Sequence, residues 1–201
     1  MVNTPSTMLP LGTRAPDFSL LEPLTGRTRS LKEFIAPATV IMFICNHCPF
    51  VIHVRDELTR VSSDYAHQGV AFIAINSNSL ETHPEDGPEH MVKLVREMGW
   101  TFPFLFDETQ EVAKAYHAAC TPDFYVFDED MKLAYRGQLD DSRPSLQIPV
   151  TGADLRAAID AVLAGHPARE EQRPSIGCNI KWAPGNEPAY FTAFIAGKKT
   201  G

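Results

Sequence analysis

The sequence VIMFICNHCPFV, residues 40–51, changes its hydrophobic pattern half-way along, and this change predicts a strand, a tight turn and a helix. The first five residues are apolar and mostly β-branched or aromatic, which is typical of a short strand buried on both faces. After the turn, apolar residues recur at the spacing of one buried helix face, at Val51, Val54, Leu58, Val61 and Tyr65. Pro49 suits the first helical position because its missing N–H would be unbonded there anyway. We therefore expect Cys48 at the N-cap of the helix.

A cysteine at that position has unusual chemistry. Unpaired backbone N–H groups and the positive end of the helix dipole both favour a thiolate over a thiol. Such sites lower the pKa of a cysteine from about 8.5 to about 3.5–7.5. A protonated His47 would add to the effect, and the alternative is that His47 is a turn residue facing solvent. The pattern predicts Cys48 as a nucleophile, with His47 and Pro49 in supporting roles.

Composition narrows the classes of function. The chain has 201 residues, enough for one domain with a sizeable core. A formal net charge of -7 and a pI near 5.5 argue against nucleic acid or an anionic membrane as the main partner. The first residues do not resemble a signal peptide, and no apolar stretch reaches membrane-spanning length. Four cysteines in this length are not the framework of a small secreted protein, so we expect a cytoplasmic location.

The rest of the chain alternates strand and helix signals. Residues 70–75 predict a second buried strand, joined to the first by a right-handed crossover. Asp107 and Gln110 form the capping signature of a short helix. Residues 124–137 predict a hairpin, and Thr151 with Asp154 starts a last helix.

The polar segment between Asn76 and His90 has two interpretations. It contains His83 and Asp86, so a metal-binding loop is one of them. Asp86 followed by Glu89 also fits the start of a helix. We favour the helix start, with Asp86 as its cap, because it explains more of the residues.

A family resemblance rests on the first half of the chain. Gly-x-x-Ala-Pro-Asp-Phe-x-Leu at residues 12–20, a glycine turn at Gly26, a Ser-Leu step at 30–31 and an apolar strand ending in Cys-Pro resemble the alkyl hydroperoxide reductase/thiol-specific antioxidant branch of the thioredoxin superfamily. The likeness runs from about Leu11 to Gly165. It implies an α/β, thioredoxin-like fold with a central mixed sheet flanked by helices, an N-terminal extension and a C-terminal tail. We expect a redoxin domain over residues 1–166 and a tail over 167–201.

The resemblance also defines a site around Cys48. Thr121-Pro122 looks like the superfamily step that carries a cis proline facing the helix cysteine, where the exposed backbone can pair with an extended substrate. A superfamily Cys-x-x-Cys has its first cysteine at the N-cap, so its second would stand at Val51. The pair Cys45-x-x-Cys48 is shifted three residues toward the strand. Cys45 or Cys120 is then expected to resolve a mixed disulfide on Cys48, and the alternative for each is a small buried hydrophobe.

The tail resembles that of an uncharacterised peroxiredoxin-like subgroup with an Asn-His-Cys-Pro turn. One interpretation is a structural clasp in which Trp182, Tyr190 and Phe194 pack on the domain or on a second subunit. The other is a redox role for Cys178. We favour the clasp because aromatic anchors more often bury area than take part in chemistry.

Thiol–disulfide exchange through Cys48 is the leading hypothesis for the function. A peroxidase ranks second, because Cys45 occupies the family's threonine position and Ile41 its proline position; Arg136 and Arg143 are basic but do not match its arginine motif. A metal or binding module is the third hypothesis, and its ligands would be Cys45, His47 and Cys48, with His53 or Cys120. We expect no cofactor and no bound metal. The expected partners are protein or small-molecule disulfides and thiols, a thioredoxin-type reductant and a second copy of the chain.

Overall fold

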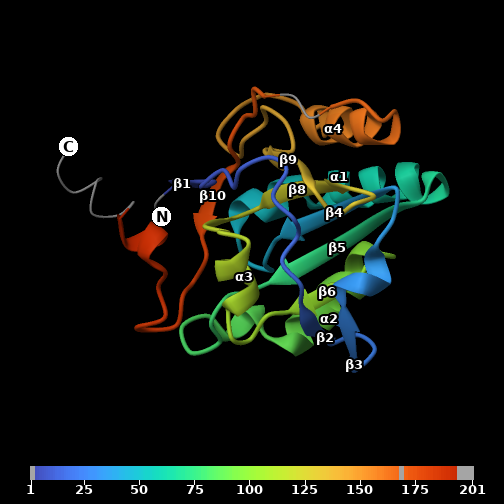
Figure 1. Ribbon diagram of the computed structural model, residues 1–201. Helices are drawn as coiled ribbons and strands as arrows, with labels where there is room; N and C mark the ends of the chain where they lie inside the picture. Colours follow the sequence, from blue (N-terminus) through green and yellow to red (C-terminus); the bar gives the residue numbers. More distant parts are fainter. Residues whose placement is uncertain (1–2, 168–169, 194–201) are drawn as a thin grey trace.

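The fold is built on a central seven-stranded mixed sheet (Figure 1). The computed structural model describes residues 3–167 and 170–193. The strand order is β3-β2-β6-β5-β4-β8-β9. These strands span Ser19–Glu22 (β2), Arg27–Ser30 (β3), Ala38–Phe43 (β4), Val70–Asn76 (β5), Phe104–Phe106 (β6), Asp123–Asp128 (β8) and Leu133–Gly137 (β9). The helices are α1 (Pro49–Tyr65), α2 (Pro88–Met98), α3 (Glu111–Ala115) and α4 (Ala153–Leu163), with short 3-10 turns at Leu31–Phe34, Ala66–Gln68 and Pro84–Asp86. The predicted mixed α/β fold is confirmed.

β4 is the centre of this sheet. All six of its residues are buried, and it pairs in parallel with β5 and antiparallel with β8. Because successive side chains alternate between the two faces of a strand, Val40 and Met42 pack with α1, α2 and α4, whereas Ile41 and Phe43 pack with α3 and the tail. The buried strand predicted from residues 40–44 is therefore confirmed.

Helix α1 begins as the sequence predicts. Cys48 is the N-cap, Pro49 is the first helical residue, and the predicted apolar stripe is buried. Glu57 lies next to this apolar stripe and is buried as well, with only 4% exposure. Its carboxylate lies 2.8 Å from Arg156 on α4 and 2.6 Å from Arg60, so ion pairs compensate the charge that burial removes from water.

The start of α2 corrects one prediction. The helix is present, but its N-cap is Gly87, and the Asp86 side chain does not cap it. The carboxylate of Asp86 is instead completely buried and bound to other partners. The short helix predicted after Asp107 is present, but its N-cap is Gln110. The Asp107 carboxylate still accepts hydrogen bonds from the backbone N–H groups of Val112 and Ala113 in the first turn of α3.

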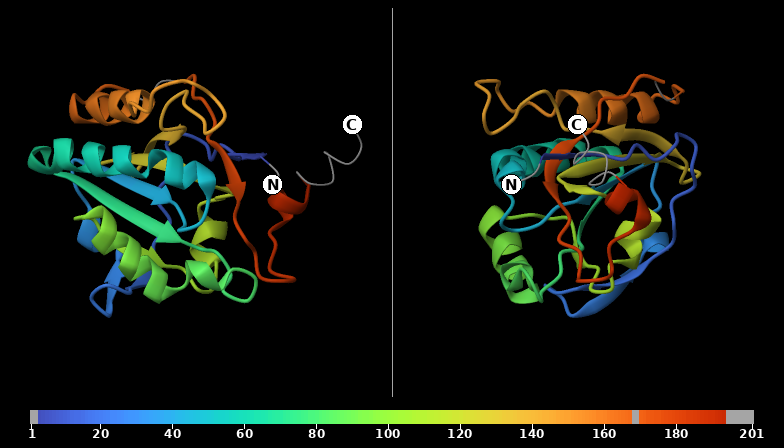
Figure 2. Two further views of the ribbon diagram at one scale, coloured as in Figure 1. Left: turned by 180° about the vertical axis from the view of Figure 1, so that it is seen from behind. Right: turned by 90° about the vertical axis from the view of Figure 1, so that its left-hand side faces the viewer.

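A second, three-stranded sheet attaches the tail to the domain. The tail strand β10 (Ile176–Asn179) lies between β1 (Asn3–Pro5) and β7 (Cys120–Thr121) and pairs antiparallel with both (Figure 2). Beyond it, Trp182 is buried in the cluster beside α3, and the Tyr190 hydroxyl donates to the Ala118 carbonyl at 2.9 Å. Phe194, the third predicted anchor, lies outside the described residues. No helix in the described ranges has the length and apolar character needed to cross a membrane.

Candidate active site

Two parallel strands end at the same edge of the sheet and bring their following loops together. β4 leads into the turn that carries Cys45, Asn46 and His47, and β5 leads into the loop before α2. Ligand and catalytic sites of α/β sheets commonly lie at this edge, beyond the carboxyl ends of the strands. Here the Asn46 backbone N–H donates to the Asp86 carboxylate at 2.9 Å, which ties the two loops together.

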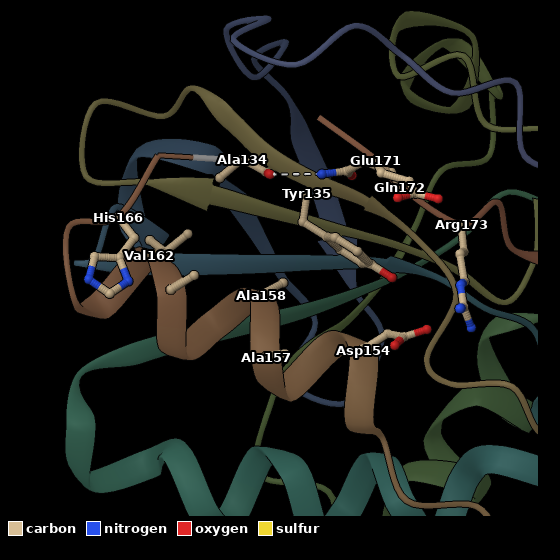
Figure 3. A pocket seen from close by; sticks show the side chains of 11 residues that line it. Ala134, Tyr135, Asp154, Ala157, Ala158, Val162, His166, Glu171, Gln172 and Arg173 are labelled. Atoms are coloured by element: carbon tan, nitrogen blue, oxygen red, sulfur yellow. Dashed lines mark hydrogen bonds between the residues drawn. The ribbon is translucent and has the colours of Figure 1, made fainter. Parts of the chain in front are cut away.

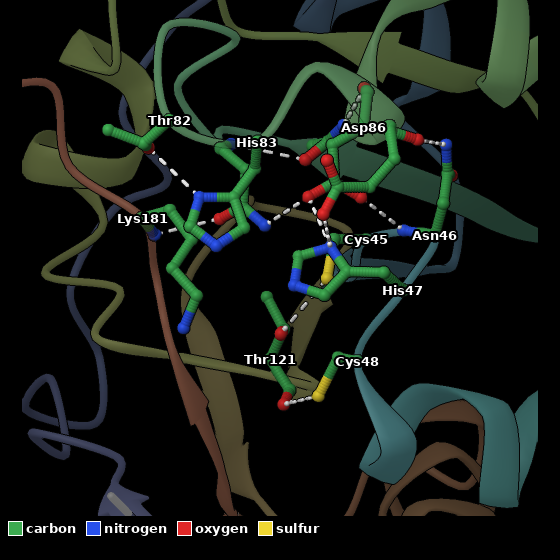
Figure 4. A network of polar contacts seen from close by, with 12 residues as sticks. Cys45, Asn46, His47, Cys48, Thr82, His83, Asp86, Thr121 and Lys181 are labelled. Atoms are coloured by element: carbon green, nitrogen blue, oxygen red, sulfur yellow. Dashed lines mark hydrogen bonds and ion pairs between the residues drawn. The ribbon is translucent and has the colours of Figure 1, made fainter. Parts of the chain in front are cut away.

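Thr121 brings two cysteines to one point. The Thr121–Pro122 peptide bond is cis, as the resemblance implies. The sulfur of Cys48 lies 3.2 Å from the Thr121 carbonyl oxygen, and the sulfur of Cys45 lies 3.5 Å from the Thr121 hydroxyl oxygen (Figure 4). Cys45 and Cys48 therefore both contact Thr121 near the N-terminus of α1. Cys45 contacts its side chain, and Cys48 contacts its backbone carbonyl.

The tail strand adds a third cysteine. In the pairing of β10 with β7, Cys178 lies directly opposite Thr121, and Asn179 lies opposite Cys120. Side chains of directly opposed residues share one face of a sheet, so Cys178 lies on the face where the Thr121 side chain meets Cys45. The Cys178 thiol hydrogen-bonds to Cys48, and Cys45, Cys48 and Cys178 belong to one buried cluster.

Cys120 does not join them. Successive side chains of a strand point to opposite faces, so Cys120 faces away from the side that Thr121 shares with the other thiols. Its sulfur contacts the Pro122 carbonyl oxygen at 3.9 Å, and burial raises the pKa of its thiol well above the ordinary value. All four cysteines are within the described part of the chain, and they form no disulfide there. No contact in the described part of the chain supports a resolving role for Cys120.

The three thiols have unequal pKa values. Hydrogen bonds from Cys178, from Cys45 and from the Val51 backbone N–H lower the pKa of Cys48 far below its ordinary value, although burial opposes them. The hydrogen bonds with Cys48, together with burial, raise the pKa of Cys45 and of Cys178. As a thiol, Cys48 donates to the Thr121 carbonyl; as a thiolate, it accepts from the two neighbouring thiols. This arrangement favours Cys48 as the thiolate and the other two as proton donors.

His47 is held by a buried carboxylate that the sequence analysis assigned to a helix cap. Its Nδ1 lies 2.7 Å from Asp86 Oδ2, and its ring stacks on His83 with 5.0 Å between centroids. The close contact with the Asp86 carboxylate raises the pKa of His47. Burial acts to raise the pKa of Asp86, but the contact with His47 and the hydrogen bond from Asn78 outweigh it and leave that pKa lowered. Figure 4 shows the His47 ring turned toward Asp86, so it is not a solvent-facing turn residue.

A family model for the AhpC/TSA family matches residues 11–136. The chain belongs to the AhpC/TSA family. Among curated proteins, it is 27% identical over 133 residues to thiol-disulfide oxidoreductase ResA from Geobacillus thermodenitrificans, a match covering 65% of this chain and 70% of the relative.

Two solved structures are similar to this AhpC/TSA chain. An uncharacterized conserved protein from Geobacillus kaustophilus is 59% identical, with a TM-score of 0.90 and coverage of 92% of this chain and 98% of that one. The thioredoxin domain of a thiol-disulfide oxidoreductase from Bacteroides vulgatus has a TM-score of 0.59 at 15% identity, covering 76% of this chain and 99% of that one. The second likeness concerns the fold alone, which is thioredoxin-like.

The two arginines considered for the AhpC/TSA chain have different surroundings. Arg136 is completely buried, donates to Asp123 at 3.0 Å and to the His117 carbonyl at 2.8 Å, and lies over the Tyr125 ring. Arg143 donates to the side-chain oxygen of Gln138 and to backbone carbonyls of its own loop. These contacts favour structural roles for both.

Two groups of side chains near Cys48 have the composition of metal ligands. The potential ligand atoms of Cys45, His47 and Asp86 lie within 4.8 Å of one another, as do those of His47, His83 and Glu85. Sulfur, imidazole and carboxylate donors suit zinc. Neither group contains Cys48, His53 or Cys120, the other ligands considered from the sequence.

One cavity lies elsewhere in the described part of the molecule. It has a volume of about 300 Å³ and lies between α4, β9 and residues 171–173, where Gln172 donates to the Ala134 carbonyl (Figure 3). Small side chains of α4, including Ala158 and Ala161, form part of its wall. None of the four cysteines lines it. The cavity is therefore separate from the thiol cluster.

Proposed function

We propose that this protein is a thiol–disulfide oxidoreductase in which the Cys48 thiolate attacks a disulfide bond. The observation that carries the proposal is the position of Cys48 at the N-terminus of α1, in one buried cluster with two other thiols and beside the cis Thr121–Pro122 bond. The name of the Geobacillus thermodenitrificans relative, a thiol-disulfide oxidoreductase, supports the same chemistry.

The first step is a balanced exchange. The Cys48 thiolate attacks one sulfur of the substrate disulfide, whose S–S bond breaks while a Cys48–substrate disulfide forms and the other substrate sulfur leaves as a thiolate. A second thiol of the protein then attacks Cys48 and releases the rest of the substrate. In total the substrate gains two electrons and the pair of cysteines loses two, so a dithiol reductant must restore the pair.

Peroxide reduction remains the second hypothesis. The family's threonine hydroxyl is replaced by the thiol of Cys45, and Ile41 in the proline position is buried on the opposite face of the sheet from Cys48. Arg136 is already engaged by Asp123. Peroxide consumption by the reduced protein no faster than that of an ordinary thiol would remove this hypothesis.

Metal binding is the other alternative, favoured by the grouping of Cys45, His47 and Asp86. Zinc bound there would require the Cys45 thiolate and would therefore release a proton. Protein purified without chelator should contain one equivalent of zinc under this alternative. Exchange activity that is unchanged by zinc or by chelator would separate the two functions.

We also propose the substrates, the reductant, the assembly and the cellular location that the sequence suggests. The substrates are protein or small-molecule disulfides, with a thioredoxin-type protein as the reductant, no nucleic acid or membrane partner, and a homodimer as the assembly. A cytoplasmic location, predicted from composition and cysteine use, would be tested by fractionation of the native cell. Analytical ultracentrifugation of the purified chain tests the homodimer.

The test of the proposed function is reduction of a small-molecule disulfide by the protein with a dithiol in excess. Cys48→Ser should lower the rate to that of the dithiol alone. Cys120→Ser is the matched control, because it also replaces a buried thiol next to Thr121 but on the other face of the strand. Full activity in Cys48→Ser would overturn the proposal.

A further inference from the structure

The tail strand occupies the place where an extended substrate would pair with the protein. An exposed strand edge such as that of β7 can bind an extended peptide through its backbone groups. Here β10 of the same chain fills that edge, with Cys178 opposite Thr121. Cys48 is consequently 0% exposed and Cys178 is 3% exposed. The protein thus presents one of its own cysteines to Cys48 in the manner of a bound substrate.

Gly177 permits the close approach of β10 to the active site. A Cβ atom at this position would lie 2.0 Å from the Thr121 carbonyl oxygen and 2.6 Å from its carbon, both backbone atoms that cannot move aside as a side chain can. Gly177 has an extended backbone within β10, so the need for glycine comes from space. A larger residue would hold Cys178 away from Cys48.

Hydrogen bonds on both sides of Cys178 fix the strand. The Ser175 hydroxyl donates to the Gly137 carbonyl at 2.5 Å, and the Ile180 N–H donates to the Ala119 carbonyl at 3.0 Å. Beyond them, the Lys181 N–H donates to the Asn78 side-chain oxygen at 2.8 Å. These contacts bind the tail to three different parts of the domain and hold the Cys178 thiol in place.

We propose that Cys178 is the cysteine that resolves the mixed disulfide on Cys48, so that the oxidised protein carries a Cys48–Cys178 disulfide. The inference rests on the proposed function. Cys45 also hydrogen-bonds to Cys48, but it is held in the turn before α1, next to the Thr121 hydroxyl. Cys178 belongs to the strand that must move away for a substrate sulfur to reach Cys48, and its return brings a thiol back to that sulfur.

In the resolving step, Cys178 loses its proton to solvent and its sulfur attacks the Cys48 sulfur of the mixed disulfide. The bond between Cys48 and the substrate breaks, the substrate sulfur leaves as a thiolate, and the Cys48–Cys178 bond forms. Before the first step, the hydrogen bond with Cys48 and its negative charge raise the pKa of Cys178. Formation of the mixed disulfide removes that charge, which makes Cys178 easier to deprotonate when its turn to attack comes.

Peptide mapping of the full-length protein after reaction with oxidised glutathione tests this inference. Wild-type protein should yield the Cys48–Cys178 linked peptide. Cys178→Ser should accumulate glutathione on Cys48, with the adduct decaying more slowly by about tenfold or more, because an oriented intramolecular thiol has been lost. Cys45→Ser should still form the Cys48–Cys178 link, and Cys120→Ser controls for the loss of a buried thiol.

The outcomes separate the inference from the proposed function. A Cys45–Cys48 link in the wild type, or accumulation of the adduct in Cys45→Ser and not in Cys178→Ser, would overturn the role of Cys178 and leave Cys48 as the nucleophile. Absence of any glutathione adduct or disulfide on Cys48 in all four proteins would overturn both. The wild-type map alone decides the linkage if a variant fails to fold.

Discussion

Cys178 lies directly opposite Thr121 across the β10–β7 pair, and the carbonyl of that threonine lies 3.2 Å from the sulfur of Cys48. Cys178 in the tail and Cys48 at the start of α1 therefore both lie beside Thr121, the residue before the cis proline. This relationship closes the site to solvent, and it makes access to Cys48 depend on movement of the tail strand.

Replacing Gly177 by valine should expose Cys48. The new Cβ cannot occupy its place beside the Thr121 carbonyl, so β10 must shift, and overpacking of this kind costs about 1–3 kcal/mol. The alkylation rate of Cys48 should rise on the order of tenfold, since about 1.4 kcal/mol corresponds to a factor of ten. Ile176→Val changes an exposed residue of the same strand and is the control. Equal alkylation rates in Gly177→Val and the wild type would show that β10 does not gate the site.

The ion pair between His47 and Asp86 should give stability a defined pH dependence. The pKa of Asp86 is lowered in the folded protein, so its contribution is present above the unfolded value and lost as the pH falls through the folded one. The pKa of His47 is raised, so its contribution is complete below about pH 6.5 and lost as the pH rises through the folded value. The pair should stabilise the fold most between about pH 4 and 6.5.

Asp86→Asn tests this window. It should lower the free energy of unfolding by about 1–3 kcal/mol, because buried groups that bind this carboxylate lose their partner. It should also flatten the change of stability with pH above pH 6.5, as measured by urea unfolding at several pH values. Glu85→Gln removes the more exposed neighbouring carboxylate and is the control. A wild-type pH profile in Asp86→Asn would show that the pair does not contribute in this way.

Arg136 should be a determinant of stability. Arg136→Met would leave the carboxylate of Asp123 buried without its cation, and breaking a buried pair in this way costs about 3–5 kcal/mol. Arg173→Met removes a guanidinium from a solvent-exposed pair with Asp141 and should change stability far less. Chemical denaturation of both variants measures the difference. A double variant that adds Asp123→Asn should recover part of the loss, and no recovery would argue against the ion pair as its cause.

The fold was predictable because its signals are local. The apolar run at residues 40–44 and Pro49 determine where β4 ends and where α1 begins, and both lie within a few residues of each other in the sequence. Asp86 misled the prediction because a carboxylate three residues before Glu89 also matches a helix cap. The parallel arrangement of β4 and β5 was the signal that could have placed its loop beside His47, since parallel neighbours end at the same edge.

The site was only partly predictable because one of its contacts is not local. Cys48 and the Thr121–Pro122 step can be recognised from neighbouring residues, whereas Cys178 is more than a hundred residues from Cys48 in the sequence. Its position depends on which strand β10 pairs with and in which register, and a shift of one residue would turn the thiol to the opposite face. Trp182 and Tyr190 pack against the rest of the chain, but aromatic residues carry no information about that register.

The most direct test of the account is a titration of thiolate absorbance in the ultraviolet, which requires no access of a reagent to Cys48. The wild type should retain the absorbance of one thiolate at pH values well below about 8.5, the usual pKa of a cysteine. Cys48→Ser should lose that absorbance, and Cys178→Ala should shift it to higher pH because the hydrogen bond from Cys178 is gone. A wild-type protein whose thiols all titrate near 8.5 or above would contradict the central claim that Cys48 is the thiolate nucleophile.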